Sequence, residues 1–256
     1  MIHPTAIVDA AACLDDDVEV GAYSIIGADV EIGAGTVIGP HVVIMGPCSI
    51  GRDNRIFQFS SIGEAPQDKK YQGERSWLRL GDRNTIREFV TLNRGTADGS
   101  NETLIGNDNL FMAYTHVAHD CIVGDHTVFA NAASLSGHVE VGSYSILGGF
   151  TSVHQFTRIG HRAFLGLGSV VTQDVPPFST AAGNRAKVIG INKEGLRRKG
   201  FAPELIRALH TSCRELLKAR GSKQQAFEKL GPLCDKYPEV DEFVRFIKDS
   251  KRGIAS

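Results

Sequence analysis

The sequence predicts an all-β parallel β-helix over residues 1–190, followed by a small α-helical domain over residues 191–256. The first observation is that every sixth residue from Ile2 to Ile62 is aliphatic. The second is that glycine often follows this aliphatic residue, which is typical of the hexapeptide repeat of a parallel β-helix. The third is that apolar residues near the C-terminus recur about every 3.6 residues, the period of an α-helix.

Each hexad is expected to form one short strand and one corner, and three hexads complete a triangular coil. The coils stack about 4.8 Å apart, the spacing of hydrogen-bonded strands. The aliphatic residue fills the interior, and the residue four positions further on, which is small or nearly so, also points inward. The aliphatic positions of the first run are Ile2, Val8, Leu14, Val20, Ile26, Ile32, Ile38, Ile44, Ile50, Ile56 and Ile62.

Two interruptions of the repeat predict loops near residues 63–79 and 97–104. In the first, Asp68 and Glu74 stand where aliphatic residues are due. In the second, one step of the repeat is thirteen residues long, one more than two hexads. Long loops in compact folds are more often functional than idle. The repeat is expected to end at the Val175-Pro176-Pro177 segment, because proline cannot donate a ladder hydrogen bond.

Three helices are expected in the C-terminal part. The first lies within residues 203–220, where leucine and isoleucine follow a helical period. Ser222 and Gln225 match a capping box at the start of the second. Pro238 suits the first position of the third.

Composition argues against several classes of protein. The 256 residues carry a net charge of −1, so no basic field indicates nucleic-acid binding. No apolar run approaches the roughly 18 residues of a membrane helix, and the N-terminus lacks the pattern of a signal peptide. The five cysteines are scattered, odd in number and without a C-x-x-C pair. Reduced thiols in a cytoplasmic protein fit this usage best.

Histidines cluster in the second half of the repeat. His119, His138 and His154 fall on one face of three successive coils, and His116 is expected at the corner leading onto it. None of the four occupies an inward position, so all should point outward. A structural role is usual for one such histidine, but four on one stripe indicate a site. Metal binding would need three imidazoles about 2 Å from one ion, whereas general-base catalysis would need one imidazole with a pKa near neutral.

The neighbours of these histidines leave alternatives open. Asp120 follows His119 and could support its imidazole, although adjacent strand residues point oppositely, so contact would require a corner geometry. Cys121 raises the alternative of a Cys/His nucleophile, but it stands at the small inward position, where a buried filler is expected. The basic cluster Arg197-Arg198-Lys199 is either a solvated helix face or a phosphate site.

Eight segments resemble the UDP-N-acetylglucosamine O-acyltransferase family, and they cover nearly the whole chain. They are GRDNRIFQFSSIGE (51–64), QDKKYQGE (67–74), IREFVTLNRGT (86–96), HVAHDC (116–121), SGHV (136–139), VHQF (153–156), QDVPP (173–177) and NKEGLRRKGF (192–201). Many acyl- and acetyltransferases share the repeat, so the specificity of the resemblance comes from these segments together.

The resemblance implies a left-handed β-helix and a homotrimer with active sites in clefts between subunits. It implies transfer of an (R)-3-hydroxyacyl group from acyl carrier protein to the glucosamine 3-hydroxyl of UDP-N-acetylglucosamine, the first step of lipid A biosynthesis, with no metal or cofactor. His119 matches the general base, and the backbone N–H of Gly137 matches the oxyanion stabiliser. The matching substrate contacts are Asp68, Lys70, His116, His138, His154 and Gln155, and the positions that hold the nucleotide are Asn192, Glu194, Arg198 and Lys199.

The chain departs from the family at three positions. Asn93 stands where histidine is frequent, and Lys199 stands where arginine is common, which would weaken a bidentate grip on phosphate. Leu167 stands where a glycine in some members leaves the acyl groove deep. We therefore expect a medium-chain rather than a long 3-hydroxyacyl donor.

Three other classes of protein could share a β-helix of this kind. The later N-acyltransferase of the same pathway shares the repeat, but the histidine stripe and the QDKKY loop favour the O-acyltransferase. A zinc enzyme like the β-helical carbonic anhydrases would need three histidines converging across a subunit interface. An ice-binding β-helix would need a regular outward row of threonines, which this sequence lacks. The basic residues expected to receive the acidic acyl carrier protein are Lys193, Arg197, Arg207, Lys218 and Arg220.

Overall fold

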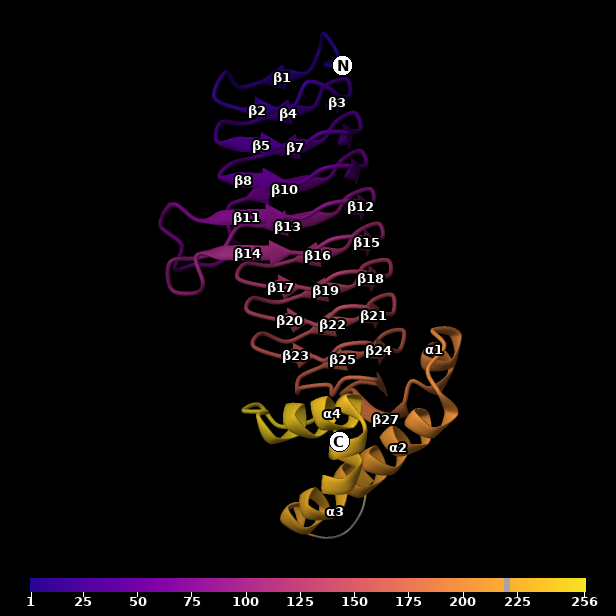
Figure 1. The fold of residues 1–256 in the computed structure, drawn as a ribbon. Coiled ribbons are helices and arrows are strands. Elements are labelled where there is room, and N and C mark those ends of the chain that lie inside the picture. The colour runs from indigo at the N-terminus through magenta and orange to yellow at the C-terminus, as the bar shows by residue number, and fades with distance from the viewer. Residues whose placement is uncertain (219–221) are drawn as a thin grey trace.

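The computed structural model describes residues 1–218 and 222–256, and Figure 1 shows their arrangement. Short strands wind into stacked coils, and the helices follow at the C-terminal end of the stack. Strand β1 (Ile7–Val8) pairs in parallel with β4 (Ile25–Ile26), with Ile7 opposite Ile25. This offset equals three hexads, so one coil contains three strands. The predicted parallel β-helix followed by helices is confirmed.

The strands form three sheets, one on each side of the coil, in which neighbouring strands are parallel except for β26 and β27. Sheet A contains β3 (Glu19–Val20), β6 (Val37–Ile38), β9 (Arg55–Ile56), β12 (Thr85–Ile86), β15 (Leu110–Phe111), β18 (Val128–Phe129), β21 (Ile146–Leu147), β24 (Phe164–Leu165), β26 (Ser179–Ala182) and β27 (Lys187–Ile191). Sheet B contains β1, β4, β7 (Val43–Ile44), β10 (Ser61–Glu64), β13 (Thr91–Asn93), β16 (His116–Val117), β19 (Ser134–Leu135), β22 (Ser152–Val153) and β25 (Val170–Val171). Sheet C contains β2 (Cys13–Leu14), β5 (Val30–Ile32), β8 (Cys48–Ile50), β11 (Trp77–Leu80), β14 (Glu102–Ile105), β17 (Ile122–Val123), β20 (Glu140–Val141) and β23 (Arg158–Ile159).

The interior follows the repeat. Ile44 and Ile62, at aliphatic positions of successive coils in sheet B, are fully buried. The small position is also buried, as at Thr127 and Ala133. At most corners from Tyr23 onward one residue has a positive φ, for example 60° at Tyr23. This left-handed conformation lets the chain change direction within two residues.

Two loops interrupt the coils. The first joins β10 to β11 and spans residues 65–76, and the second joins β13 to β14 and spans residues 94–101. Both project from the same side of the β-helix (Figure 1). The expected range 97–104 was too late for the second loop, because strand β14 begins at Glu102 and pairs with β11 along its whole length.

Sheet A continues past the two prolines, although the six-residue period does not. Strand β26 continues sheet A by pairing in parallel with β24, and β27 then turns back antiparallel to it. Pro176 and Pro177 lie in the corner between Val175 and β26. Their missing N–H groups therefore remove no ladder hydrogen bond. Phe164 pairs with Thr180, an offset of 16 residues where the preceding coil has 18 (Ile146 with Phe164), so the six-residue period ends here as predicted.

The C-terminal part contains the helices of the chain, which lie between residues 193 and 248. Its elements are α1 (Lys193–Arg198), α2 (Pro203–Cys213), the π-helical turn η1 (Arg214–Lys218), α3 (Lys223–Lys236) and α4 (Pro238–Lys248). Pro238 opens α4 as predicted, whereas the Ser222 side chain makes no capping hydrogen bond, so the predicted capping box is wrong. Across residues 1–218 and 222–256, no helix combines the length and apolar character that crossing a membrane requires.

The chain end returns to the β-helix. Ile254 forms a parallel bridge with Asp174, and the Ser250 hydroxyl donates to the Asp174 carboxylate at 2.8 Å. This contact brings residues 249–252 beside the corner that joins sheets B and C.

Candidate active site

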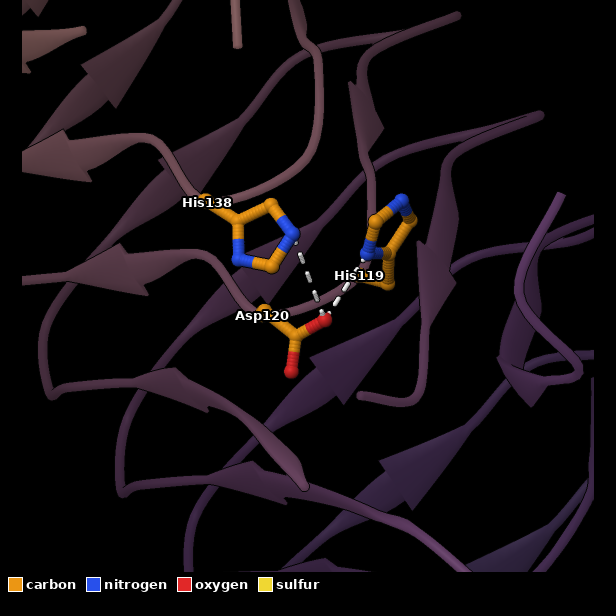
Figure 2. Close-up of side chains that lie close together, drawn as sticks. All are labelled: His119, Asp120 and His138. Atoms are coloured by element: carbon orange, nitrogen blue, oxygen red, sulfur yellow. Dashed lines mark hydrogen bonds and ion pairs between the residues drawn. The ribbon is translucent and has the colours of Figure 1, made fainter. Parts of the chain in front are cut away.

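The corner after strand β16 brings His119 and Asp120 together. Asp120 has a φ of 59°, so its side chain turns back toward the preceding residue instead of pointing away from it. His119 Nδ1 lies 2.8 Å from Asp120 Oδ2 (Figure 2). The corner geometry that the sequence required for this contact is therefore present. His119 stands in the turn rather than on a strand face, while His116 belongs to strand β16 and not to a corner.

Asp120 is buried and its carboxylate is fully engaged. Oδ2 accepts hydrogen bonds from the Thr96 hydroxyl at 2.6 Å and from the Thr96 N–H at 3.2 Å, and Oδ1 accepts from the Ser100 N–H at 3.0 Å. Burial alone would raise the pKa of Asp120, but the hydrogen bonds from His119 and Thr96 outweigh it and hold the pKa at about 2. The carboxylate is therefore an anion at neutral pH. Because the ionised carboxylate can only accept a hydrogen bond, it favours the His119 tautomer that has its proton on Nδ1 and its lone pair on Nε2.

His138 occupies the equivalent corner of the next coil. Its Nε2 lies 3.9 Å from Asp120 Oδ2, and its ring meets the His119 ring edge-on at 5.1 Å (Figure 2). Phe156, one coil further, stacks on His138 at 4.4 Å. Burial lowers the pKa of His138, although the Asp120 charge opposes the shift, so this imidazole favours its neutral form.

Gly137 stands in the same corner, at the position that His119 holds one coil earlier. A Cβ atom at residue 137 would lie 2.5 Å from His119 Cε1 and 2.7 Å from His119 Nε2. Glycine is thus required for the imidazole to lie across this backbone. Among the described residues, none accepts a hydrogen bond from the Gly137 N–H, so this donor is available beside the free nitrogen of His119.

A cleft of about 1550 Å³ runs along this corner. It brings together five of the residues named from sequence, which are Asp68, Lys70, His119, His138 and Gln155. Sequence reasoning missed other lining residues, among them Ser100, Phe156, Arg158, Lys251 and Arg252. The last two arrive only because the chain end folds back, and no local motif signals that contact.

His116 and His154 lie beside this cleft rather than in its lining. The His116 ring hydrogen-bonds the Thr91 hydroxyl at 2.7 Å, and burial lowers the pKa of His116. His154 is exposed, and its Nδ1 lies 2.8 Å from Arg252 Nη2. The histidines therefore do not form a single convergent set.

The remaining named residues lie elsewhere on the chain. Asn192, Glu194, Arg198 and Lys199 belong to α1 and its two ends, on the opposite side of the β-helix from the two loops (Figure 1). Leu167 is 77% exposed and stands in the corner that joins sheets A and B. One chain thus does not bring these residues to His119.

A metal ion fits the corner poorly. His119, Asp120 and His138 place one potential donor atom each within 4.8 Å of one another. Both oxygens of Asp120, however, already accept hydrogen bonds from Thr96, Ser100 and His119. A zinc ion would have to displace these contacts to reach about 2 Å. The arrangement suits a hydrogen-bonded acid–base pair better.

Cys121 does not supply a nucleophile. Its side chain is fully buried, and Sγ donates toward the Ser136 carbonyl at 3.2 Å. Burial raises the pKa of the Cys121 thiol to about 12. The thiolate that nucleophilic catalysis needs is therefore scarce at neutral pH, in agreement with the filler role expected from the repeat.

Known proteins are similar in sequence to this chain over nearly its full length. A curated relative from Herminiimonas arsenicoxydans, named acyl-[acyl-carrier-protein]–UDP-N-acetylglucosamine O-acyltransferase, is 53% identical over 258 aligned positions and covers 99% of this chain and 98% of its own. The chain belongs to the UDP-N-acetylglucosamine O-acyltransferase family. The family model for its second domain matches residues 174–255, and hexapeptide-repeat models match residues 14–46 and 102–137.

Solved structures of the family have the same fold. The UDP-N-acetylglucosamine O-acyltransferase of Moraxella catarrhalis is 44% identical, with a TM-score of 0.97 over 100% of this chain and 99% of its own. That of Francisella novicida is 37% identical, with a TM-score of 0.95 over 99% of this chain and 93% of its own. The left-handed parallel β-helix with a small helical domain is thus confirmed.

Proposed function

We propose that this protein transfers an (R)-3-hydroxyacyl group from acyl carrier protein to the 3-hydroxyl of the glucosamine in UDP-N-acetylglucosamine, the first step of lipid A biosynthesis. The observation that carries the proposal is the 2.8 Å contact of His119 with Asp120, with the Gly137 backbone against the same imidazole. A base and an oxyanion donor side by side are what acyl transfer to a hydroxyl requires.

The reaction follows from this geometry. His119 Nε2 removes the proton of the sugar hydroxyl as its oxygen attacks the thioester carbonyl. The Gly137 N–H donates to the oxyanion of the tetrahedral intermediate. The C–S bond then breaks, and the imidazolium returns its proton to the departing thiolate. Asp120 stays ionised throughout and stabilises the imidazolium, because its pKa is about 2.

We infer that a second copy completes the site, as expected for a homotrimer. The α1 residues proposed to hold the nucleotide, together with Leu167, lie away from the His119 cleft in one chain. A neighbouring subunit of a trimer would bring them to it. Leu167 would then border the acyl groove and favour a medium-length chain.

A basic groove on the helical domain supports an acidic carrier protein as the donor's partner. The groove measures about 480 Å³, and its lining includes Lys193, Arg197 and Arg207. Of the other residues expected to receive the carrier protein, Arg220 lies outside the described residues. We further propose a cytoplasmic enzyme, in keeping with five free cysteines.

The test is a transfer assay with UDP-N-acetylglucosamine and a series of 3-hydroxyacyl carrier proteins. We expect the wild type to turn over and His119→Ala to lose roughly a hundredfold or more in kcat, the usual cost of a general base. His126→Ala is the matched control, because His126 stacks on Tyr144 in a different corner. An inactive wild type, or equal rates for the two variants, would overturn the proposal.

A further inference from the structure

The second loop, residues 94–101, reaches the acid–base pair through Thr96. The Thr96 side chain is buried, and its hydroxyl donates to Asp120 Oδ2 at 2.6 Å. The same oxygen faces His119 Nδ1 at 2.8 Å. One carboxylate oxygen therefore lies between the hydroxyl of the loop and the imidazole of the corner.

The loop also fixes the second oxygen of the carboxylate. Asp120 Oδ1 accepts from the Ser100 N–H at 3.0 Å and from the Ser100 hydroxyl at 3.2 Å. Gly99 packs so closely that a Cβ there would lie 2.3 to 2.5 Å from the carboxyl atoms of Asp120. Rotation of the carboxylate would break these contacts, so its orientation is set by the loop.

The loop is itself anchored. The N–H groups of Gly99 and Asn101 donate to the Thr96 carbonyl at 3.1 and 3.0 Å. Arg94 donates to the Gly63 carbonyl at 3.0 Å and to the Tyr71 hydroxyl at 3.1 Å, which ties the second loop to the coil and to the first loop. The hydroxyl of Thr96 is thus held at a defined place relative to Asp120.

We propose that Thr96 is a positioning residue for the acyl transfer, whose hydroxyl orients Asp120 so that His119 keeps its proton on Nδ1 and its lone pair on Nε2. This inference rests on the proposed function. Thr96 acts through Asp120, and it does not line the cleft. Which nitrogen of an imidazole carries the proton is set by the hydrogen bond of the other, so a loosened Asp120 allows the unproductive tautomer.

Other titratable groups lie near His119 or interact with its neighbours. His138 meets its ring at 5.1 Å, His116 interacts with its charge, and Asp68 acts on His138. The tautomer of His119 should therefore be measured at a pH where the imidazoles are neutral. Differences between variants at that pH report on the hydrogen bond to Asp120 and not on the neighbouring charges.

The experiment compares Thr96→Val with Thr96→Ser in the full-length protein. Valine keeps the shape and the N–H but removes the hydroxyl, whereas serine keeps the hydroxyl. We expect Thr96→Val to lower kcat about tenfold or more, with KM for UDP-N-acetylglucosamine nearly unchanged. In nitrogen-15 spectra of the histidines, the His119 signals are assigned as those that disappear in His119→Gln. In Thr96→Val, the His119 Nε2 signal should shift toward that of a protonated nitrogen. Thr96→Ser should restore both properties.

Two further variants keep the inference falsifiable. Thr127→Val is the matched control, because it removes a buried threonine hydroxyl that donates to Asn109 Oδ1 at 2.7 Å outside the lining of the cleft, so its kcat should stay within about threefold. Gly99→Ala should displace the carboxylate and reproduce the Thr96→Val spectrum without changing a buried side chain, and it replaces Thr96→Val if that variant does not fold. In an active wild type, a Thr96→Val (or Gly99→Ala) kcat within twofold of normal, or a lower kcat with an unchanged His119 tautomer, would overturn the inference. An inactive wild type would instead overturn the proposed function.

Discussion

The backbone of Gly137 lies against the imidazole of His119, so closely that a Cβ at residue 137 would fall 2.7 Å from Nε2. The two residues occupy equivalent corner positions of successive coils, which the β-helix stacks at the spacing of hydrogen-bonded strands. The repeat thereby places a backbone N–H group one layer from the His119 imidazole, and no loop has to carry either group.

Gly137→Ala should push the His119 ring out of place. We expect kcat to fall about a hundredfold, because displacing a reacting group by about 1 Å has that effect, while the melting temperature changes little. Gly190→Ala is the control, since a Cβ there would meet no atom within 4 Å. A Gly137→Ala enzyme with kcat within threefold of normal would contradict this view of the corner.

Asp120→Asn should destabilise the protein in a pH-dependent way. The pKa of Asp120 falls from 3.8 to about 2 on folding, so the ionised carboxylate stabilises the folded state above about pH 4 and loses that effect as pH falls through 2. We expect the variant to lose about 2 kcal/mol in the free energy of unfolding at pH 7, measured by denaturant titration. The difference from wild type should shrink toward pH 2, and a difference that stays constant with pH would refute the assignment.

Leu167→Gly should lengthen the preferred acyl donor. Leu167 is 77% exposed in one chain, so its removal should leave stability nearly unchanged. If it borders the acyl groove of the trimer, the ratio of kcat/KM for fourteen-carbon over ten-carbon donors should rise about tenfold or more. Assays with the two acyl carrier proteins measure this ratio. An unaltered ratio would place the end of the groove at other residues.

Charge reversal in the basic groove should weaken the binding of acyl carrier protein and leave the binding of UDP-N-acetylglucosamine unchanged. We expect Arg197→Glu with Arg207→Glu to raise KM for the acyl carrier protein severalfold, more so at low salt, because exposed charges act through screened fields. KM for UDP-N-acetylglucosamine should stay constant. Arg55→Glu with Lys187→Glu, exposed reversals on β9 and β27 that change the net charge by the same amount, is the matched control. An equal change in both variants would indicate an effect of net charge only.

Much of the fold could be predicted because the repeat is local. A six-residue period specifies which side chains point inward, and stacking parallel coils follows from hydrogen bonding between identical turns. Thus Cys121 was expected to be buried from its position in the hexad alone, and it is fully buried. The prolines at 176 and 177 mark the end of the six-residue period, but composition does not reveal that they stand in a corner, after which β26 still extends sheet A.

The acid–base pair could be predicted only in part. His119 was singled out from the stripe of histidines in the repeat, and the resemblance to the family implied its role as general base. Whether Asp120 contacts it depended on a φ of 59°, a backbone conformation that the stacked corner imposes. Thr96 ends a segment that resembles the family but was given no role, and Arg252 carried no signal, since the two reach the site through a loop and through the returning chain end. Such contacts join residues 24 and 98 positions apart in sequence, between Thr96 and Asp120 and between His154 and Arg252.

The amino-acid sequence specified the coil, its interior and the family, because each of these depends on periodicity or on short contiguous segments. Three-dimensional packing determined the ionisation and orientation of the Asp120 carboxylate, because both depend on which hydrogen-bond donors lie against it. Asp120 is an anion oriented toward His119 owing to donors from a loop more than one coil away in sequence. Hydrogen bonds of this kind fall off within a few tenths of an ångström, so they are set by the folded geometry and not by residue type.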